Sequence, residues 1–458
     1  MIQKISPPIP RTLVDLFAGC GGLSLGFENA GFIPVFVNEI NNDALDTYLR
    51  NRPYELGGMR FADNPDLHCN DANELKGKRL QQLLSDLQDI KSIDFRFDAG
   101  TKKSGAGSTL DIVTGGPPCQ GFSGLGIRRS YDVHRKNIPS NHLYGRMAKI
   151  IGAIRPRIFL FENVRGILNA KWTKKGKERI WPDVTAAFKR IPGYEVRWSV
   201  VFAKDYGVPQ NRPRVLLVGI RRDILATPNL AGVIEPLNDP EDAIACGFLP
   251  RGEDGAFQNL VDLLGDLEDR KIPRILRTQT FPEGTFKTAS YPRAPKPGSI
   301  QESLRMPPKW ASNEPIQLTE QEYSRHRQHI VAKFDFMLKN NGNIPEEYRT
   351  KKFSQRLLPK RWGRNIPNIT AASLPDDYVH YSQPRILTVR EWARLQLFPD
   401  WYRFSGSRTT GGILRAGNPR LGIFERDVPK YTQIGNAVPV GLAEKVALHF
   451  RRILDQAC

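Results

Sequence analysis

Cys119 is the residue of this sequence whose surroundings best suit nucleophilic chemistry. It lies in Gly-Gly-Pro-Pro-Cys-Gln-Gly-Phe-Ser, residues 115–123, directly after the apolar run 110–114. The prolines and glycines predict a rigid polar loop at a strand end, which is where α/β active sites form. A thiolate in such a loop is a strong nucleophile. A lone cysteine is more often a buried structural residue, and on this motif alone that interpretation stays open.

Ionisable side chains that could transfer a proton or bind an anion flank two further apolar runs. Glu162 follows the run 158–161, and a carboxyl group at the mouth of a buried strand can act as a proton donor. Arg212 and Arg214 precede the run 215–220, and at a spacing of two residues their side chains can point the same way. Together they could hold a phosphate or the polar edge of a base. Taken singly, the glutamate could be a helix cap and the arginines a solvated strand end.

A glycine-rich turn offers a site for a ligand with a ribose. Asp-Leu-Phe-Ala-Gly-Cys-Gly-Gly, residues 15–22, joins an expected strand at 11–17 to an expected helix at 23–30. Glycines there let the backbone approach a ligand at the helix N-terminus. Glu39 follows a second expected strand at 33–37, where an acidic residue commonly binds ribose hydroxyls. The two features indicate an adenosine-containing cofactor, although a tight turn beside a surface glutamate is the plain alternative.

The spacing of the apolar runs predicts the elements that position these motifs. Over residues 1–225, short apolar runs alternate with segments long enough for helical crossovers, which is typical of a doubly wound, mainly parallel α/β sheet. A helix at 75–90 is expected within an insertion at 74–107. From 226 to 430 this alternation is lost and proline, glycine and basic residues are frequent. We therefore predict a smaller, irregular second domain, at 226–430, in which 320–339 is the likeliest long helix.

The motifs occur in one order along the chain, and two longer ones follow them. The set is Asp-Leu-Phe-Ala-Gly-Cys-Gly-Gly, Gly-Pro-Pro-Cys-Gln, Glu-Asn-Val, Gln-Asn-Arg-Pro-Arg, Arg-Ile-Leu-Thr-Val-Arg-Glu-Trp-Ala-Arg-Leu-Gln-Leu-Phe-Pro at 385–399 and Tyr-Thr-Gln-Ile-Gly-Asn-Ala-Val-Pro at 431–439. In this combination the sequence resembles the DNA (cytosine-5) methyltransferase family, of the bacterial restriction-modification type. The resemblance implies a Rossmann-like S-adenosylmethionine-dependent methyltransferase domain onto which residues 431–458 fold back. Residues 226–383 correspond to the variable target-recognition region.

The resemblance implies a catalytic role for four residues. The Cys119 thiolate would attack C6 of a cytosine flipped out of the duplex, and Glu162 would hydrogen-bond N3 and the exocyclic amine. Arg214, with Arg212 in support, would hold O2 of the ring and a nearby phosphate. C5 would then take the methyl group from S-adenosyl-L-methionine, and loss of the C5 proton and of the cysteine would complete turnover.

The resemblance also implies a cofactor pocket built from several segments. Its expected residues are Phe17, Gly19, Cys20, Gly22, Glu39, Asp71, Pro118, Leu143, Asn436 and Val438. Phe17 would lie against the adenine, Glu39 would bind the ribose and Asp71 would approach the adenine amine. Two positions depart from the family pattern. Ile40 stands where many members have an aromatic residue, and Asp71 follows an asparagine and not a glycine.

Composition agrees with a DNA-modifying enzyme. The chain has 458 residues and a formal net charge of +19, which favours a polyanionic partner, here double-stranded DNA. Its five cysteines include no Cys-x-x-Cys pair, so we expect neither a metal site nor a disulfide framework. No stretch approaches the ~18 uncharged apolar residues that span a membrane. We expect a monomeric cytoplasmic enzyme, associated with the nucleoid through DNA, and a cognate restriction endonuclease as a genetic partner.

Two alternatives come from different functional classes. An RNA cytosine-5 methyltransferase can share the scaffold, but its tRNA-modifying branch usually carries a Cys-Phe-Thr signature that this sequence lacks. A nucleic-acid-binding protein without catalysis is disfavoured because Cys119, Glu162 and Arg214 are all intact. Within 405–430, further DNA contacts could come from Arg408, Arg415, Arg420 and Arg426.

Overall fold

The computed structural model describes most of the chain. The described residues are 11–56, 58–89, 110–118, 139–172, 177–230, 234, 242–255, 257–281, 286–308, 316–349, 355–363, 366, 377–409 and 427–457. Cys119 lies outside the described residues, as do Arg415, Arg420 and Arg426.

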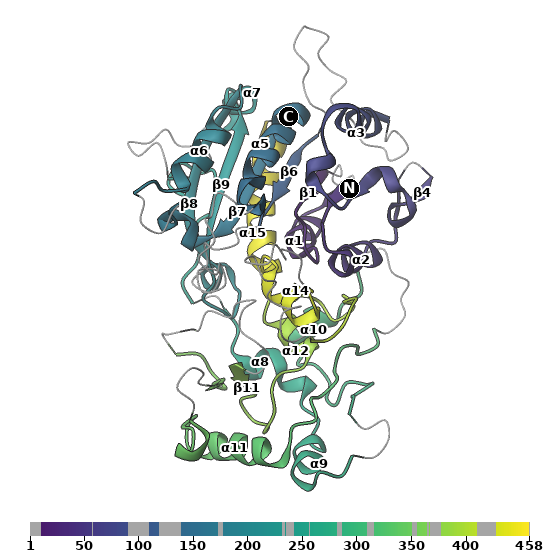
Figure 1. Ribbon diagram of the computed structural model, residues 1–458, viewed down its shortest axis with the longest axis vertical. Helices are drawn as coiled ribbons and strands as arrows, with labels where there is room; N and C mark the ends of the chain where they lie inside the picture. Colours follow the sequence, from purple (N-terminus) through teal and green to yellow (C-terminus); the bar gives the residue numbers. More distant parts are fainter. Residues whose placement is uncertain are drawn as a thin grey trace, which may run out of the picture.

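A seven-stranded sheet in the order β5-β2-β1-β6-β7-β9-β8 forms the centre of the larger part (Figure 1). Its strands are β1 (Arg11–Leu16), β2 (Phe32–Asn38), β5 (His68–Cys69), β6 (Ile112–Gly115), β7 (Ile158–Val164), β8 (Tyr194–Phe202) and β9 (Pro213–Arg221). The pairs from β5 to β7 are parallel, whereas β9 is antiparallel to both β7 and β8. The predicted mainly parallel sheet is confirmed, with an antiparallel edge.

The strand order reverses between β1 and β6. These two strands are parallel neighbours with Leu16 opposite Gly115, and the chain continues from β1 to β2 on one side and from β6 to β7 on the other. In doubly wound sheets, ligands bind outside the carboxyl ends of the strands at such a reversal. The glycine-rich turn after β1 and the Gly-Pro-Pro segment after β6 therefore leave the same edge of the sheet as neighbours.

Helices cover both faces of this sheet. They are α1 (Gly22–Asn29), α2 (Asn42–Arg50), α3 (Gly77–Asp89), α5 (Leu143–Ile154), α6 (Trp181–Lys189), α7 (Arg222–Leu225) and α15 (Val440–Gln456). Side chains of α2, α3, α5 and α6 share one apolar core with Val14 and Phe161. Those of α1 and α15 share another with Leu13 and Leu160. Alternate residues of each strand thus face opposite helix layers.

The C-terminal helix α15 lies beside α1, although the two are far apart in the sequence (Figure 1). A Cβ placed on Gly26 of α1 would collide with the Ala443 Cβ of α15, so the two helices approach each other closely. Residues 440–456 are therefore part of the layer that covers the sheet.

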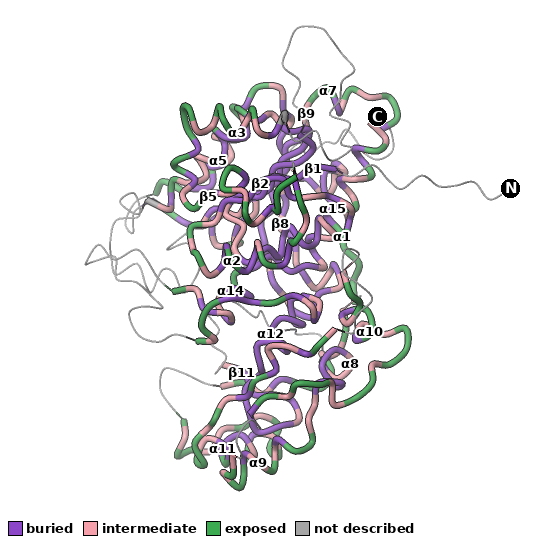
Figure 2. Tube along the Cα trace, turned by 90° about the vertical axis from the view of Figure 1, so that its right-hand side faces the viewer, coloured by how far each residue is buried: buried purple, intermediate pink, exposed green. Residues whose placement is uncertain are grey.

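The remaining residues form a less regular part with short elements. These are α8 (Leu260–Leu264), α9 (Ile272–Thr278), α10 (Ile300–Arg305), α11 (Gln328–Lys339), α12 (Val389–Arg394), α14 (Lys430–Asn436) and a pair of strands, β10 (Arg356–Leu357) and β11 (Tyr378–Val379). A further hairpin, β3 (Glu55–Leu56) with β4 (Met59–Arg60), follows α2. Figure 2 shows buried residues running through the strands and more exposed ones around α9 and α11. No helix within the described residues has the length and apolar character needed to cross a membrane.

The helix predicted at 320–339 is wrong in its first part. The structure has a helix only from Gln328 to Lys339. Glu320 has a φ of +63°, which no right-handed helix accommodates, and Glu322 forms a β-bridge with Lys287. Tertiary pairing therefore takes precedence over helical spacing in 320–327.

Candidate active site

The turn between β1 and α1 has an unusual backbone. Phe17, Gly19 and Gly21 all have positive φ, at 57°, 57° and 85°. Left-handed backbone costs a residue with a side chain about 1 kcal/mol, so neighbouring groups must hold Phe17 in this conformation. The backbone N–H of Ala18 donates to the carbonyl of Asn38 at 2.9 Å. The turn is thereby fixed against the end of β2.

Two glycines of the turn have different surroundings. A Cβ placed on Gly19 would meet no atom within 4 Å, so this position borders open space. A Cβ placed on Gly22 would lie 2.5 Å from the carbonyl oxygen of Val438, so a side chain would force the two segments apart. Val438, expected to close the pocket from the C-terminal segment, thus lies directly against the turn. Asn436 has an exposed side chain two residues earlier.

The Glu39 carboxylate faces the turn from the end of β2. Its Oε2 accepts a hydrogen bond from the backbone N–H of Gly19 at 2.8 Å, and its Oε1 accepts one from Asn41 at 2.9 Å. The backbone N–H of Glu39 donates to the carbonyl of Cys69 in β5 at 3.1 Å, and Asp71 lies two residues beyond. Both predicted acidic residues are therefore at the carboxyl edge of the sheet.

Three apolar side chains border the same edge. Phe17 and Leu143 are half-buried, and Ile40 is 70% exposed. The helix that begins with Leu143, α5, packs against the turn 72–74 beside Asp71. The structure thus places Phe17, Leu143, Glu39 and Asp71, four of the residues predicted to bind the cofactor, around one edge of the sheet.

Glu162 and Arg214 form an ion pair on neighbouring strands. Arg214 Nε lies 2.5 Å from Glu162 Oε1, and their side chains are 7% and 12% exposed. Burial lowers the pKa of Arg214 from its ordinary value, and the Glu162 carboxylate opposes this shift. A Cβ on Gly116 would lie 2.8 Å from Glu162 Oε2. The carboxylate is therefore held between the arginine and the segment that leads to Cys119.

Arg212 takes a different direction from Arg214. Its Nη2 lies within hydrogen-bonding distance of three backbone carbonyls, those of Gly435 at 2.6 Å, Asn436 at 3.2 Å and Ala437 at 3.0 Å. Strand β9 begins only at Pro213, so the alternation of strand side chains does not extend to Arg212. We predicted that the two arginines can point the same way, but in the structure Arg212 binds the C-terminal segment.

Asn163 is a site residue that the sequence analysis did not single out. Its Nδ2 donates to the carbonyl of Pro117 at 3.1 Å, and its side chain is buried. Asn163 follows Glu162 in β7, so the two side chains point to opposite faces of the sheet. The Glu-Asn-Val motif was the available signal. Pro118 is half-buried and is the last described residue before Cys119. The predicted nucleophile itself lies outside the described residues.

The described thiols are unsuited to nucleophilic chemistry. Cys20, Cys69 and Cys246 are all buried. Burial raises the pKa of Cys20 to about 12 and that of Cys69 to about 11. Because the thiolate is the nucleophile, Cys20 and Cys69 are inert near neutral pH, and Cys246 is shielded by burial. Within the described part of the chain, no three His, Cys, Asp or Glu side chains gather as a metal site requires.

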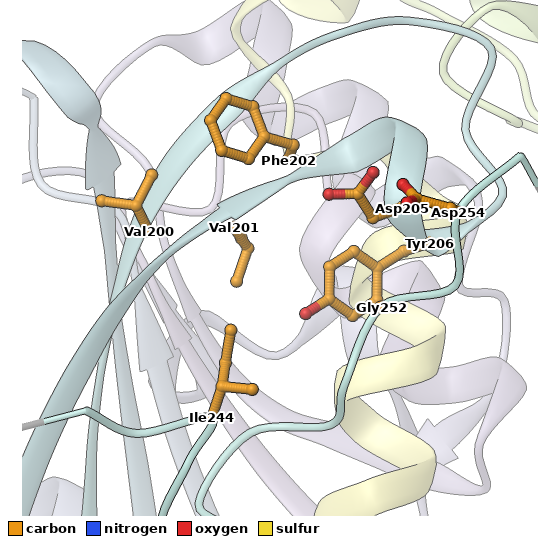
Figure 3. A pocket seen from close by; sticks show the side chains of 8 residues that line it. All are labelled: Val200, Val201, Phe202, Asp205, Tyr206, Ile244, Gly252 and Asp254. Carbon is orange, nitrogen blue, oxygen red and sulfur yellow. The ribbon is translucent and has the colours of Figure 1, made fainter.

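A cavity of about 220 Å³ lies beside the end of β8 (Figure 3). It is lined by Val200, Val201, Phe202, Asp205, Tyr206, Ile244, Gly252 and Asp254. Its volume is below the ~300–1,000 Å³ typical of small-molecule pockets. Two carboxylates line it and would repel a phosphate (Figure 3). None of the predicted site residues borders this cavity, so it is not the candidate site.

The chain is similar to several known methyltransferases. The chain is 28% identical to the Type II methyltransferase M.DdeI of Desulfomicrobium norvegicum, over 96% of this chain and 89% of the relative. It is 26% identical to the Type II methyltransferase M.NgoPII of Neisseria gonorrhoeae, over 99% and 100%. A solved structure described as a DNA modification methyltransferase from an Escherichia coli prophage has a TM-score of 0.60 at 21% identity, covering 97% of this chain and 99% of that one.

The family profile matches almost the whole chain. The profile of the C-5 cytosine-specific DNA methylases aligns with residues 11–452, which include the turn after β1, the Glu162–Arg214 pair and the C-terminal segment against Gly22. The resemblance inferred from the motifs is confirmed, and the protein belongs to the C-5 cytosine-specific DNA methylase family.

Proposed function

We propose that this DNA (cytosine-5) methyltransferase transfers a methyl group from S-adenosyl-L-methionine to C5 of a cytosine flipped out of double-stranded DNA. The observation that carries the proposal is the buried Glu162–Arg214 pair on β7 and β9. It lies beside the Gly-Pro-Pro segment, which leaves β6 at the strand-order reversal. A carboxyl group and a guanidinium at this place can together recognise N3, the exocyclic amine and O2 of one pyrimidine. The neighbouring Cys119 would supply the nucleophile.

The edge of the sheet beside β1 fits the adenosine part of the cofactor. Gly19 borders open space, and the Glu39 carboxylate is held beside it by backbone N–H groups. We assign Phe17, Ile40 and Leu143 to the adenine, Glu39 to the ribose and Asp71 to the adenine amine. Backbone groups of Gly19, Cys20 and Gly22 would hold the methionine part, and Pro118, Asn436 and Val438 would border it. When bound, the cofactor supplies an electrophilic methyl group.

The protein's own groups would carry the remaining steps. The Cys119 thiolate forms a bond to C6, and the Glu162 carboxyl group holds a proton at N3, so that the electron pair displaced from C6 makes C5 nucleophilic. Arg214 keeps O2 in place. After methyl transfer, the N3 proton returns to the Glu162 carboxylate, a base takes the C5 proton, and the electron pair of the C6–sulfur bond leaves with sulfur, which restores the aromatic ring and the thiolate. Exclusion of water strengthens each of these polar contacts.

DNA must deliver the base to this site. A cytosine inside a duplex cannot reach the sheet edge, so it must flip out at a cost of a few kcal/mol. Phosphate contacts supply binding energy to offset this cost, and the net charge of +19 suits them. Arg408, predicted to contact DNA, lies within 3.4 Å of the carbonyls of Glu322 and Tyr323, so we do not assign it to DNA.

We further propose that methylation protects host DNA from a cognate restriction endonuclease, because the relatives named above are Type II methyltransferases. The endonuclease is a genetic partner in this proposal, and the enzyme acts as a cytoplasmic monomer on a specific DNA sequence, read by residues of the irregular part. The assigned domains are 1–225 with 431–458, and 226–430.

Bisulfite sequencing of plasmid DNA incubated with the purified protein and S-adenosyl-L-methionine tests the proposal. We expect protected cytosines in one short recurring sequence, and none with Cys119→Ala, which should still bind DNA. Complete conversion of every cytosine, with an active control methyltransferase in parallel, would refute the DNA reaction. The same assay on RNA then tests the alternative substrate.

A further inference from the structure

The glycine-rich turn is held by hydrogen bonds to residues that are distant in the sequence. Tyr402 donates its hydroxyl to the carbonyl of Cys20 at 2.6 Å, and Cys20 Sγ lies 3.4 Å from the carbonyl of Gln433. A Cβ on Gly21 would lie 2.7 Å from Tyr402 Oη, so the turn rests directly on this hydroxyl. Tyr402 is completely buried. Residues beyond position 400 thus determine part of the shape of a turn at residues 17–22.

Arg52 determines which way the Tyr402 hydroxyl points. Its Nη1 donates to Tyr402 Oη at 3.3 Å and to the carbonyl of Tyr48 at 2.8 Å, and its Nη2 pairs with Glu28 at 2.6 Å. A guanidinium can only donate hydrogen bonds, so the Tyr402 oxygen accepts from it. The hydroxyl proton is then directed to Cys20. The charge on Arg52 strengthens this chain of two hydrogen bonds.

The backbone of Tyr402 is held by buried arginines of α12. Arg390 Nη2 donates to the carbonyl of Tyr402 at 2.7 Å, and its Nη1 donates to that of Pro399 at 2.9 Å. Arg394 Nη2 pairs with Asp400 at 2.5 Å. The side chains of both arginines and of Asp400 are 0% exposed. The core of the irregular part therefore holds the backbone of Tyr402 through contacts that do not involve the turn.

We propose that Tyr402 is a positioning residue for S-adenosyl-L-methionine. It touches neither the cofactor nor the cytosine, and it acts by holding the Cys20 carbonyl so that Phe17 and Gly19 keep the left-handed backbone that forms the pocket wall. Without the hydroxyl, this strained turn populates other shapes, and cofactor affinity falls in proportion to the binding-competent fraction. The proposal rests on the proposed function, because it takes the turn as the cofactor site.

Tyr402→Phe in the full-length chain tests this role, since it removes one oxygen and keeps the ring. We expect the Kd for S-adenosyl-L-methionine, measured by titration calorimetry, to rise about fivefold, as the loss of one hydrogen bond implies. The Kd for DNA and the kcat at saturating cofactor should stay within about twofold of wild type, because the Glu162–Arg214 pair is not touched.

Tyr206→Phe is the matched control. Tyr206 is 5% exposed and donates its hydroxyl to the carbonyl of Pro250 at 2.8 Å, away from the turn. Both variants lose a buried hydroxyl-to-carbonyl hydrogen bond, so similar losses of melting temperature are expected. Only Tyr402→Phe should weaken cofactor binding.

The outcomes separate this inference from the proposed function. Wild-type affinity for the cofactor in Tyr402→Phe would overturn the positioning role and leave the proposed function intact. Equal weakening in both variants would also overturn it, because the effect would then be a general loss of stability. A wild-type protein that binds no S-adenosyl-L-methionine would refute the proposed function, and the inference with it.

Discussion

Gly116→Ala should slow methyl transfer while leaving the protein folded. A Cβ at this position would lie 2.8 Å from Glu162 Oε2, and real Cβ contacts essentially never fall below 3.0 Å. The carboxylate cannot move freely, because its other oxygen lies 2.5 Å from Arg214 Nε. It must leave its preferred rotamer, at a cost of about 0.5–1.5 kcal/mol. This strain raises the free energy of the transition state, and the displaced carboxyl group is also a poorer proton donor. Together the two effects predict a roughly tenfold lower rate.

Single-turnover kinetics with saturating DNA and cofactor provide the assay, because they report the chemical step without product release. Gly152→Ala in α5 is the control, since a Cβ there would meet only Ile191 Cγ2, at an ordinary contact distance of 3.9 Å. That change should raise the free energy of unfolding by about 0.5–1 kcal/mol and leave the rate unchanged. If Gly116→Ala turned over at the wild-type rate, the position of the Glu162 carboxylate would not limit the reaction.

Three further predictions follow from burial and exposure. Ile40→Trp should tighten S-adenosyl-L-methionine binding about three- to tenfold in calorimetry, because an aromatic ring stacks on adenine better than a 70% exposed isoleucine; unchanged affinity would place the adenine elsewhere. In native protein at pH 7.5, iodoacetamide should leave Cys20, Cys69 and Cys246 unmodified by mass spectrometry until denaturant is added, and early labelling would contradict their burial. Burial raises the pKa of Asp15 to about 6 from 3.8, so the folded state holds this proton more tightly than the unfolded chain and loses stability as pH rises through this interval. In denaturant titrations, the unfolding free energy of Asp15→Asn relative to wild type should therefore increase by about 2 kcal/mol between pH 4 and pH 7, and a pH-independent difference would refute this.

Local signals predicted the strands and helices that bury continuous apolar faces. The expected runs at 11–17, 33–37 and 215–220 correspond to β1, β2 and β9, and the expected helix at 75–90 is α3, at Gly77–Asp89. Strand β8 was missed because its sequence, Tyr-Glu-Val-Arg-Trp-Ser-Val-Val-Phe, mixes charged and apolar residues, as befits the edge of a sheet. Its place depends on pairing with β9, which no local pattern encodes.

The positions of the site residues were predictable where a strand end determines them. Glu39 directly follows β2 and Glu162 lies in the second half of β7, so both are near the carboxyl ends of parallel strands, which meet at one edge. The contacts of Arg212 and Tyr402 could not be predicted from the sequence. Their partners, residues 435–437 and Cys20, are more than 200 positions away along the chain. A tyrosine hydroxyl that binds a backbone carbonyl leaves no signature in residue spacing.

The Gln-Asn-Arg-Pro-Arg motif shows why a short sequence can serve several segments at once. Gln210 donates to the carbonyl of Leu395 at the end of α12, Arg212 binds the carbonyls at the C-terminal end of α14, and Arg214 pairs with Glu162. The three side chains thus connect the irregular part, the C-terminal segment and the predicted proton donor to the start of one strand. A displacement of β9 would therefore disturb the predicted cofactor side and the predicted cytosine side together, because Arg212 and Arg214 adjoin Pro213, the first residue of the strand.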